Sequence, residues 1–473
     1  MKSPFRMQAS HVAAALVCFL GLGVATHVNA VEPKKEAKAT KATKAPAAQK
    51  DIVLDQAPSA AASSPPAAAG SRLVPRPAAP VATLERSTTD VHRAALAGHV
   101  AELGLNLLRV APAGSNAVVS PASVTLALAM LQAGVAAQDG REIAQLFGSS
   151  LQGANQLQQH LPYVLERVLG KSQSGTASGL ALASRLWVHQ GMAASLQAPY
   201  VAAMEKRFQA SGAVLDFAKA EPARSAINQW VGERTAGRIP DLLAPGSITP
   251  TTRLVLTQAT HFRGGWVQPF APANTRAAGF EIAPGQTKQV ATLHGEVKVR
   301  AAQFGGLHVI ELPFEGTDIV AQIALPPVGM PLASALNQLD GLDLAGWSTA
   351  LKPQTCRMQL PKLALKPAAQ SLKAALQSLG VNRVFGSEAS FAPALGAAGA
   401  KLQLDELFHG ATLQLDEHGA EAAAATAAVI GVKSLDLRPV QDCIVDRPFL
   451  LLLVHKPTLL PFFVARVQDP SQP

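Results

Sequence analysis

Residues 415–427 read Leu-Asp-Glu-His-Gly-Ala-Glu-Ala-Ala-Ala-Ala-Thr-Ala, an alanine-rich stretch in the last part of the chain. If this stretch is extended, successive side chains point to opposite faces. One face is then small and uncharged: Ala420, Ala422, Ala424, Thr426 and Ala428. Glu421 carries its charge on the opposite face. Four consecutive alanines also favour a helix, so an alanine-rich surface loop or short helix is the alternative interpretation.

The same stretch resembles the hinge of the reactive-centre loop of inhibitory serpins. That hinge reads Glu-x-Gly-x-Glu-Ala-x-x-Ala-x, and every fixed position is filled here. The resemblance implies these hinge residues: Glu417, Gly419, Ala420, Glu421, Ala422, Ala423, Ala424, Ala425 and Thr426. It continues from about Val91 to Asp469, with other motifs of the family arriving in order.

Three longer motifs carry the resemblance through the body of the chain. Residues 116–130, NAVVSPASVTLALAM, are similar to the serpin motif N-x-x-x-S-P-x-S-I-x-x-A-L-x-M and predict a strand followed by a helix. Residues 226–240 predict a helix that ends at Gly and Pro and resembles the family's helix across the main sheet. Residues 254–270 predict a buried strand and a turn.

The fold class that these motifs imply is α+β. A further amphipathic helix is predicted at residues 95–108. The resemblance implies the serpin fold, in which helices surround large, mainly antiparallel β-sheets and a reactive-centre loop is exposed.

The resemblance also implies two control regions. Ser120, Ser123 and His409 match a hydrogen-bonding cluster that latches the centre of the family's main sheet. Gln258 stands where that latch usually has Asn, and its extra methylene shifts the geometry. In the region where the loop enters the sheet, Glu417 is expected near Lys362 and Trp266.

The reactive bond follows from the family's usual loop length. Counting from Glu417 gives Lys433, followed by Ser434, and a lysine suits proteases whose specificity pocket is acidic, as trypsin's is. The stretch before Pro448 is longer than is common in the family. Other cut sites therefore remain open, namely Ile430, Leu435 and Arg438.

The N-terminal part predicts export. Residues 1–30 are typical of a signal peptide: Lys2 and Arg6 precede an apolar run too short to span a bilayer, and Val28-Asn29-Ala30 suits a cleavage site. Residues 31–88 are rich in Ala, Pro and Lys and predict a disordered linker. Residues 89–473 are left for the serpin domain. We expect a secreted or periplasmic protein.

Charge and motifs exclude other classes of function. The chain of 473 residues carries a formal charge of +9, concentrated before residue 89, so a nucleic-acid partner is not indicated. No nucleophile elbow, dinucleotide fingerprint or zinc spacing is present, which predicts no enzyme activity, no cofactor and no metal. Cys356 and Cys443 can pair in an exported chain, but the sequence does not fix their distance.

The function that the resemblance implies is inhibition of serine proteases by a suicide-substrate mechanism. The cut loop would insert into the main sheet while the protease is still covalently attached. We expect a covalent complex with the protease, no stable membrane insertion and a monomer, with trypsin-like targets preferred. The alternatives are a non-inhibitory serpin acting as a binding protein, and an inhibitor of elastase-like or chymotrypsin-like proteases.

Overall fold

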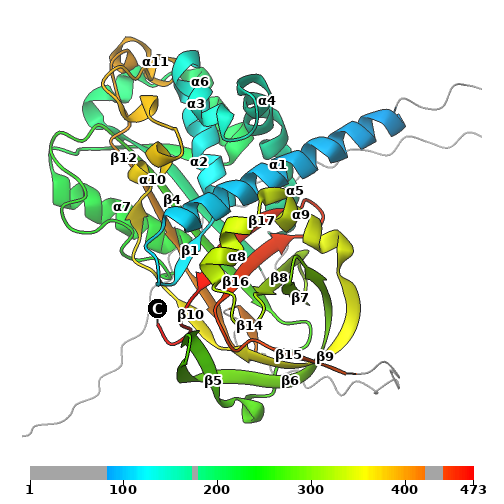
Figure 1. The fold of residues 1–473 in the computed structure, drawn as a ribbon. Helices are drawn as coiled ribbons and strands as arrows, with labels where there is room; N and C mark the ends of the chain where they lie inside the picture. Colours follow the sequence, from blue (N-terminus) through cyan, green and yellow to red (C-terminus); the bar gives the residue numbers. More distant parts are fainter. Residues whose placement is uncertain (1–81, 173–178, 421–439, 473) are drawn as a thin grey trace, which may run out of the picture. The chain divides into compact units, whose positions relative to one another are not determined.

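The computed structural model describes residues 82–172, 179–420 and 440–472. Helices surround two large β-sheets in this part of the chain (Figure 1). The α+β prediction is confirmed. The α-helices of the described residues are α1 (Ala82–Val110), α2 (Pro121–Gly134), α3 (Ala137–Gln145), α4 (Ser150–Asn155), α5 (Leu161–Ser172), α6 (Ala198–Phe208), α7 (Ala220–Arg234), α8 (Leu332–Gln338), α9 (Gly341–Ala350), α10 (Lys373–Ser378) and α11 (Ala392–Leu395).

The main sheet has the order β11 (Gln370–Ser371), β12 (Glu406–Ala411), β4 (Leu254–Gly265), β2 (Gly179–His189) and β3 (Ser211–Leu215). The two-residue strand β14 (Gly419–Ala420) pairs with the end of β4. At the centre, β12 runs parallel to β4, whereas β2 on the other side of β4 is antiparallel. The first nine residues of β4 are all buried, as expected for a central strand covered on both faces.

The second sheet is larger. Its order is β1 (Ala117–Val119), β17 (Leu460–Val467), β16 (Phe449–His455), β8 (Ile319–Leu325), β7 (Leu307–Pro313), β6 (Gln286–Phe304), β9 (Lys352–Pro361) and β15 (Gln441–Ile444), with β5 (Arg276–Ala283) on β6. A separate pair joins β10 (Leu363–Leu365) to β13 (Leu413–Leu415). The last strands before and after residues 421–439 therefore belong to different sheets.

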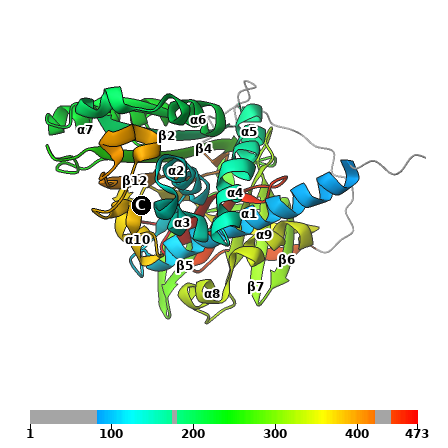
Figure 2. The same ribbon diagram turned by 90° about the horizontal axis from the view of Figure 1, so that it is seen from above.

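Helices cover both faces of the main sheet. Figure 2 shows β2 and β4 between α7 and α2. On the α7 side a small core cluster joins the helix to the sheet, including Trp187, Ile227, Val231, Val255 and Phe408. On the α2 side the sheet packs into the main core, to which Leu254, Leu256 and Phe262 belong. The predicted helix across the main sheet is thus α7.

The first helix is longer than the sequence predicts. α1 begins at Ala82, so residues 82–88, assigned above to the linker, are helical. No proline or glycine interrupts the chain between Pro80 and the predicted start of the helix, and Ala, Leu, Glu and Arg all favour helix there. None of the helices in the described part of the chain is both long enough and apolar enough to cross a bilayer.

Candidate functional site at the end of the main sheet

A tight turn between β13 and β14 forms the start of the predicted hinge. Asp416 organises it, because its Oδ1 atom accepts hydrogen bonds from the backbone N–H of His418 at 2.8 Å and of Gly419 at 3.2 Å. Trp266 holds the turn from outside: its Nε1 donates to the Asp416 carbonyl at 2.9 Å and its backbone N–H to the His418 carbonyl at 2.8 Å. The Trp266 ring is fixed by stacking on Phe314, with ring centres 4.4 Å apart.

Glu417 is anchored at the same turn. Lys362 Nζ donates to both carboxylate oxygens, at 3.0 and 2.9 Å, and Thr275 Oγ1 donates to Oε1 at 2.7 Å. Burial acts to raise the pKa of Glu417, but the hydrogen bonds from Lys362 and Thr275 outweigh it and keep that pKa below its ordinary value. The carboxylate is therefore charged at neutral pH and fixes the chain where the loop leaves the sheet. Thr275 was not identified from the sequence, because it belongs to none of the recognised motifs.

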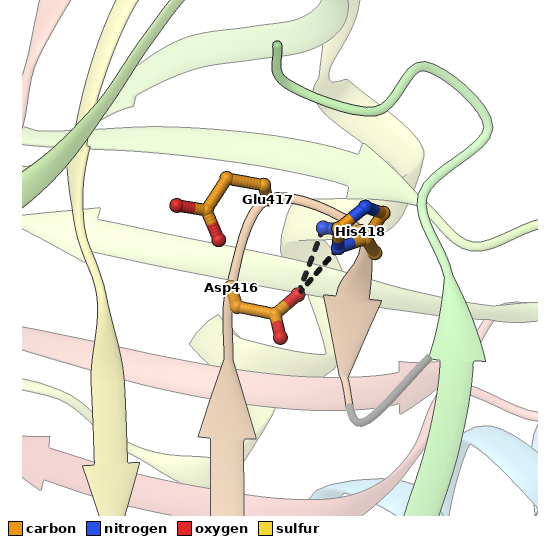
Figure 3. A group of neighbouring side chains, drawn as sticks. All are labelled: Asp416, Glu417 and His418. Atoms are coloured by element: carbon orange, nitrogen blue, oxygen red, sulfur yellow. Dashed lines mark hydrogen bonds and ion pairs between the residues drawn. The ribbon is translucent and has the colours of Figure 1, made fainter. Parts of the chain in front are cut away.

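Asp416, Glu417 and His418 bring three potential metal ligands within 4.8 Å of one another (Figure 3). Both carboxylates already accept from donors of the protein: Glu417 from Lys362 and Thr275, and Asp416 from two backbone N–H groups. We therefore assign these residues to positioning the turn, and they carry no argument for a metal.

Gly419 and Ala420 form the only described part of the hinge that lies in the sheet. They pair antiparallel with Gly265 and Gly264 of β4. Gly419 has φ +142°, and a Cβ atom placed on it would lie 2.1 Å from the Gly264 carbonyl oxygen, so only glycine fits. Ala420 has no exposed surface and belongs to the main core, the inward orientation that the alternation predicts.

The latch region lies further along the same sheet. The backbone N–H of Ser120, at the start of α2, donates to His409 Nε2 of β12 at 3.0 Å. Ser123 Oγ donates to the Ser120 carbonyl at 3.0 Å, so its hydroxyl supports the start of the helix. Complete burial lowers the pKa of His409 to about 4. A neutral His409 therefore ties the start of α2 to β12.

The family model described as Serpin (serine protease inhibitor) matches residues 99–470, well over half of the chain. This chain is a serpin.

Relatives and solved structures agree with that assignment. Antithrombin-III of Homo sapiens is 31% identical to this serpin over 359 residues, covering 75% of this chain and 76% of its own. Leukocyte elastase inhibitor of Bos taurus is 31% identical over 382 residues, covering 78% and 97%. The crystal structure of human thyroxine-binding globulin matches with a TM-score of 0.71 at 22% identity, over 80% of this chain and all of that one. The relatives thus include protease inhibitors, while the last likeness concerns the fold.

One predicted latch residue departs from the expected cluster in this serpin. Gln258 lies beside His409 in the β4–β12 register, but no hydrogen bond joins these two described side chains. Instead its Oε1 accepts from Ser184 Oγ of β2 at 2.5 Å, and its Nε2 has no hydrogen-bond partner among the described residues. The longer side chain thus reaches the neighbouring strand on the other side. Of the four predicted latch residues, the structure joins Ser120, Ser123 and His409.

The two cysteines form a disulfide. Cys356 of β9 and Cys443 of β15 are bonded, with Cα atoms 5.6 Å apart, and both are fully buried. The sequence left this pairing open, because it does not show which strands are neighbours. In the structure, the parallel pairing of β15 with β9 brings the two cysteines together.

The rest of the predicted loop lies outside the described residues. This applies to the hinge positions after Ala420, to the reactive bond and to the other cut sites: Glu421, Ala422, Ala423, Ala424, Ala425, Thr426, Ile430, Lys433, Ser434, Leu435 and Arg438.

Proposed function

We propose that this serpin is an exported suicide inhibitor of serine proteases. The observation that carries the proposal is β14, a two-residue strand that begins an antiparallel pairing with β4. Earlier along β4, at residues 255–260, β12 runs parallel to β4. A strand entering between them would be antiparallel to both. The backbone groups of the cut loop would gain partners, and one parallel pairing would be replaced by two antiparallel ones.

The register of β14 fixes which side chains would meet β4. Continued by the antiparallel rule, it places Glu421 opposite Arg263 and Ala422 opposite Phe262. Arg263 is the one exposed residue of β4, whereas Phe262 is buried in the main core. The charged hinge residue would thus meet a cation on the open face, and the alanine would enter the core. Both faces of the inserted strand would therefore match the neighbouring side chains of β4 in charge and in burial.

Trypsin-like proteases are the preferred targets in this proposal, because Lys433 stands at the family's usual cut position. Elastase-like or chymotrypsin-like targets would correspond to a cut after Ile430 or Leu435. The site of action we propose is the secreted or periplasmic space, supported by the signal-like residues 1–30 and by the disulfide, which suits an oxidising compartment.

The test is incubation of the full protein with trypsin, followed by boiling in detergent with a reductant. We expect a covalent complex together with a released C-terminal peptide. The mass of that peptide should correspond to a chain that begins at Ser434. The reductant is required, because Cys443 lies in that peptide and is bonded to Cys356. Complete cleavage without any complex, by trypsin and also by elastase and chymotrypsin, would assign the protein to the non-inhibitory serpins. A complex with a peptide that begins elsewhere would remove only the Lys433 assignment.

A further inference from the structure

Residues of five α-helices and of the short π-helix Gln156–His160 line a groove in the helical part of the molecule, where α3 and α6 lie at the opposite end from β14 (Figure 1). It has a volume of about 640 Å³, within the range of small-molecule sites. We name it the α3–α6 groove, after the two helices that supply its charges. Its lining comprises Gln132, Ala133, Val135, Ala137, Gly140, Arg141, Ala144, Ala154, Gln158, Pro199, Tyr200, Ala203, Arg207 and Pro393.

The floor of the groove is apolar and fixed. Val135, Ala144 and Tyr200 are buried side chains of the main body. The Tyr200 ring lies directly against α2, since a Cβ atom on Gly134 would be only 2.8 Å from it, and the Tyr200 hydroxyl donates to the Met130 carbonyl at 3.3 Å. The hydroxyl is therefore satisfied within the protein. The ring presents hydrocarbon to the groove.

All the charged side chains that line the groove are positive. Its lining contains two arginines, Arg141 of α3 and Arg207 of α6, and no Asp or Glu. Both arginines are exposed, and neither has an ion pair or side-chain hydrogen bond with another described residue.

The acids of α3 do not neutralise Arg141, because they serve the opposite side of the helix. Asp139 accepts from Arg383 Nε at 2.8 Å and from the Ser390 backbone at 2.9 Å. Glu142 accepts from the backbone N–H groups of Asn382 at 2.6 Å and of Arg383 at 2.8 Å. The two carboxylates of α3 are therefore hydrogen-bonded to the segment 382–390. They do not pair with Arg141, which lies at the groove.

We propose that the α3–α6 groove binds an amphipathic carboxylate, such as a medium-chain fatty acid. Guanidinium groups match carboxylates in shape and charge and form strong paired hydrogen bonds with them. The alanine, valine and tyrosine floor would take up the hydrocarbon chain, as apolar linings do in ligand sites. This ligand site is independent of loop insertion.

The test is titration of the full-length protein with decanoate, followed by calorimetry and by thermal unfolding. We expect saturable binding at one site and a Tm that rises with ligand concentration. Each of Arg141→Gln and Arg207→Gln should weaken binding roughly tenfold, the value of one charge-assisted hydrogen bond. Arg276→Gln is the matched control, because it removes the same charge from an exposed position on β5 and should leave the affinity unchanged.

A second variant tests the floor. Ala203→Phe places a ring in the groove from a half-buried position on α6 and should abolish decanoate binding without changing the Tm of the free protein by more than a few degrees. Equal affinity for decanoate and 1-decanol would overturn the proposal, because the arginines would then have no role. Binding that Arg276→Gln weakens as much as the groove variants would also overturn it, as would binding of a sulfated polysaccharide in place of decanoate.

Discussion

Gly419 lies closer to a neighbouring backbone than any residue with a side chain could. A Cβ atom there would meet the Gly264 carbonyl oxygen at 2.1 Å and the Gly265 Cα at 2.8 Å. Gly419→Ala is therefore expected to break the β14–β4 pairing and to cost about 1–3 kcal/mol of the free energy of unfolding.

Thermal or denaturant unfolding measures this loss. The control is Gly346→Ala on α9, where nothing lies within 4 Å of the added carbon. That variant should be neutral or slightly stabilising, since alanine favours a helix over glycine. Equal behaviour of the two variants would show that the close approach at Gly419 does not matter.

Among the described residues, sequence reasoning anticipated which ones meet at the loop-entry turn, but it did not anticipate all of their partners. Glu417, Trp266 and Lys362 lie together as the resemblance implies, because their motifs are local and distinctive. Thr275 could not be identified, since it is a single threonine between a short 3-10 helix and β5 and belongs to no recognised motif. Gln258 was placed in the right strand and register, but the length of its side chain sends its hydrogen bond to Ser184.

At the scale of elements, the contact between α2 and β12 depends on a neutral imidazole. His409 Nε2 accepts from the Ser120 backbone, and burial lowers the pKa of His409 to about 4. The unfolded chain, with a His pKa near 6.5, binds the proton more readily between these values. Stability is therefore complete above about pH 6.5 and falls as the pH drops to about 4, by about 3 kcal/mol for this residue.

Chemical denaturation at a series of pH values measures that slope. His409→Asn should reduce it. His261, whose pKa burial also lowers to about 4, titrates in the same window, so part of the slope should persist in the variant. An unchanged slope in His409→Asn would show that His409 is not the group responsible.

The proposed insertion makes the two faces of the hinge unequal. Ala422 would enter the core opposite Phe262, whereas the next residue, Ala423, would point to the open face. Ala422→Arg should therefore convert the inhibitor into a substrate, since a buried unpaired charge costs several kcal/mol. Ala423→Arg is the matched control and should still trap trypsin.

The ratio of covalent complex to cleaved protein, at equal amounts of trypsin, measures the difference. If both variants trapped the protease as the natural sequence does, the strand-insertion account would be wrong. If both failed equally, the register read from β14 would be wrong.

At the scale of the whole molecule, the disulfide ties the strand after the loop to the second sheet. Cys356 and Cys443 are separated by 87 residues, so the bond restricts the unfolded chain strongly. Cys356→Ser together with Cys443→Ser should cost about 2–4 kcal/mol of the free energy of unfolding.

On a denaturing gel, a chain cut within residues 421–439 should migrate as one species without reductant and as two fragments with reductant. The double serine variant is the control and should give two pieces in both conditions. Separation of the pieces from the natural sequence without reductant would mean that the bond is absent from the folded protein.

In the proposed mechanism, the intact molecule holds β12 against β4 although a fuller main sheet would be open to it. A cut beyond the alanines would allow about ten residues to pair with β4 and β12, each backbone hydrogen bond contributing about 1 kcal/mol before the cost of ordering. We therefore expect the clipped protein to melt about 10 °C or more above the intact one. Calorimetry after limited trypsin digestion measures the shift, and the clipped Ala422→Arg variant, which cannot complete the insertion, should lack it. Equal melting temperatures for clipped and intact protein of the natural sequence would mean that the intact fold is already the most stable one.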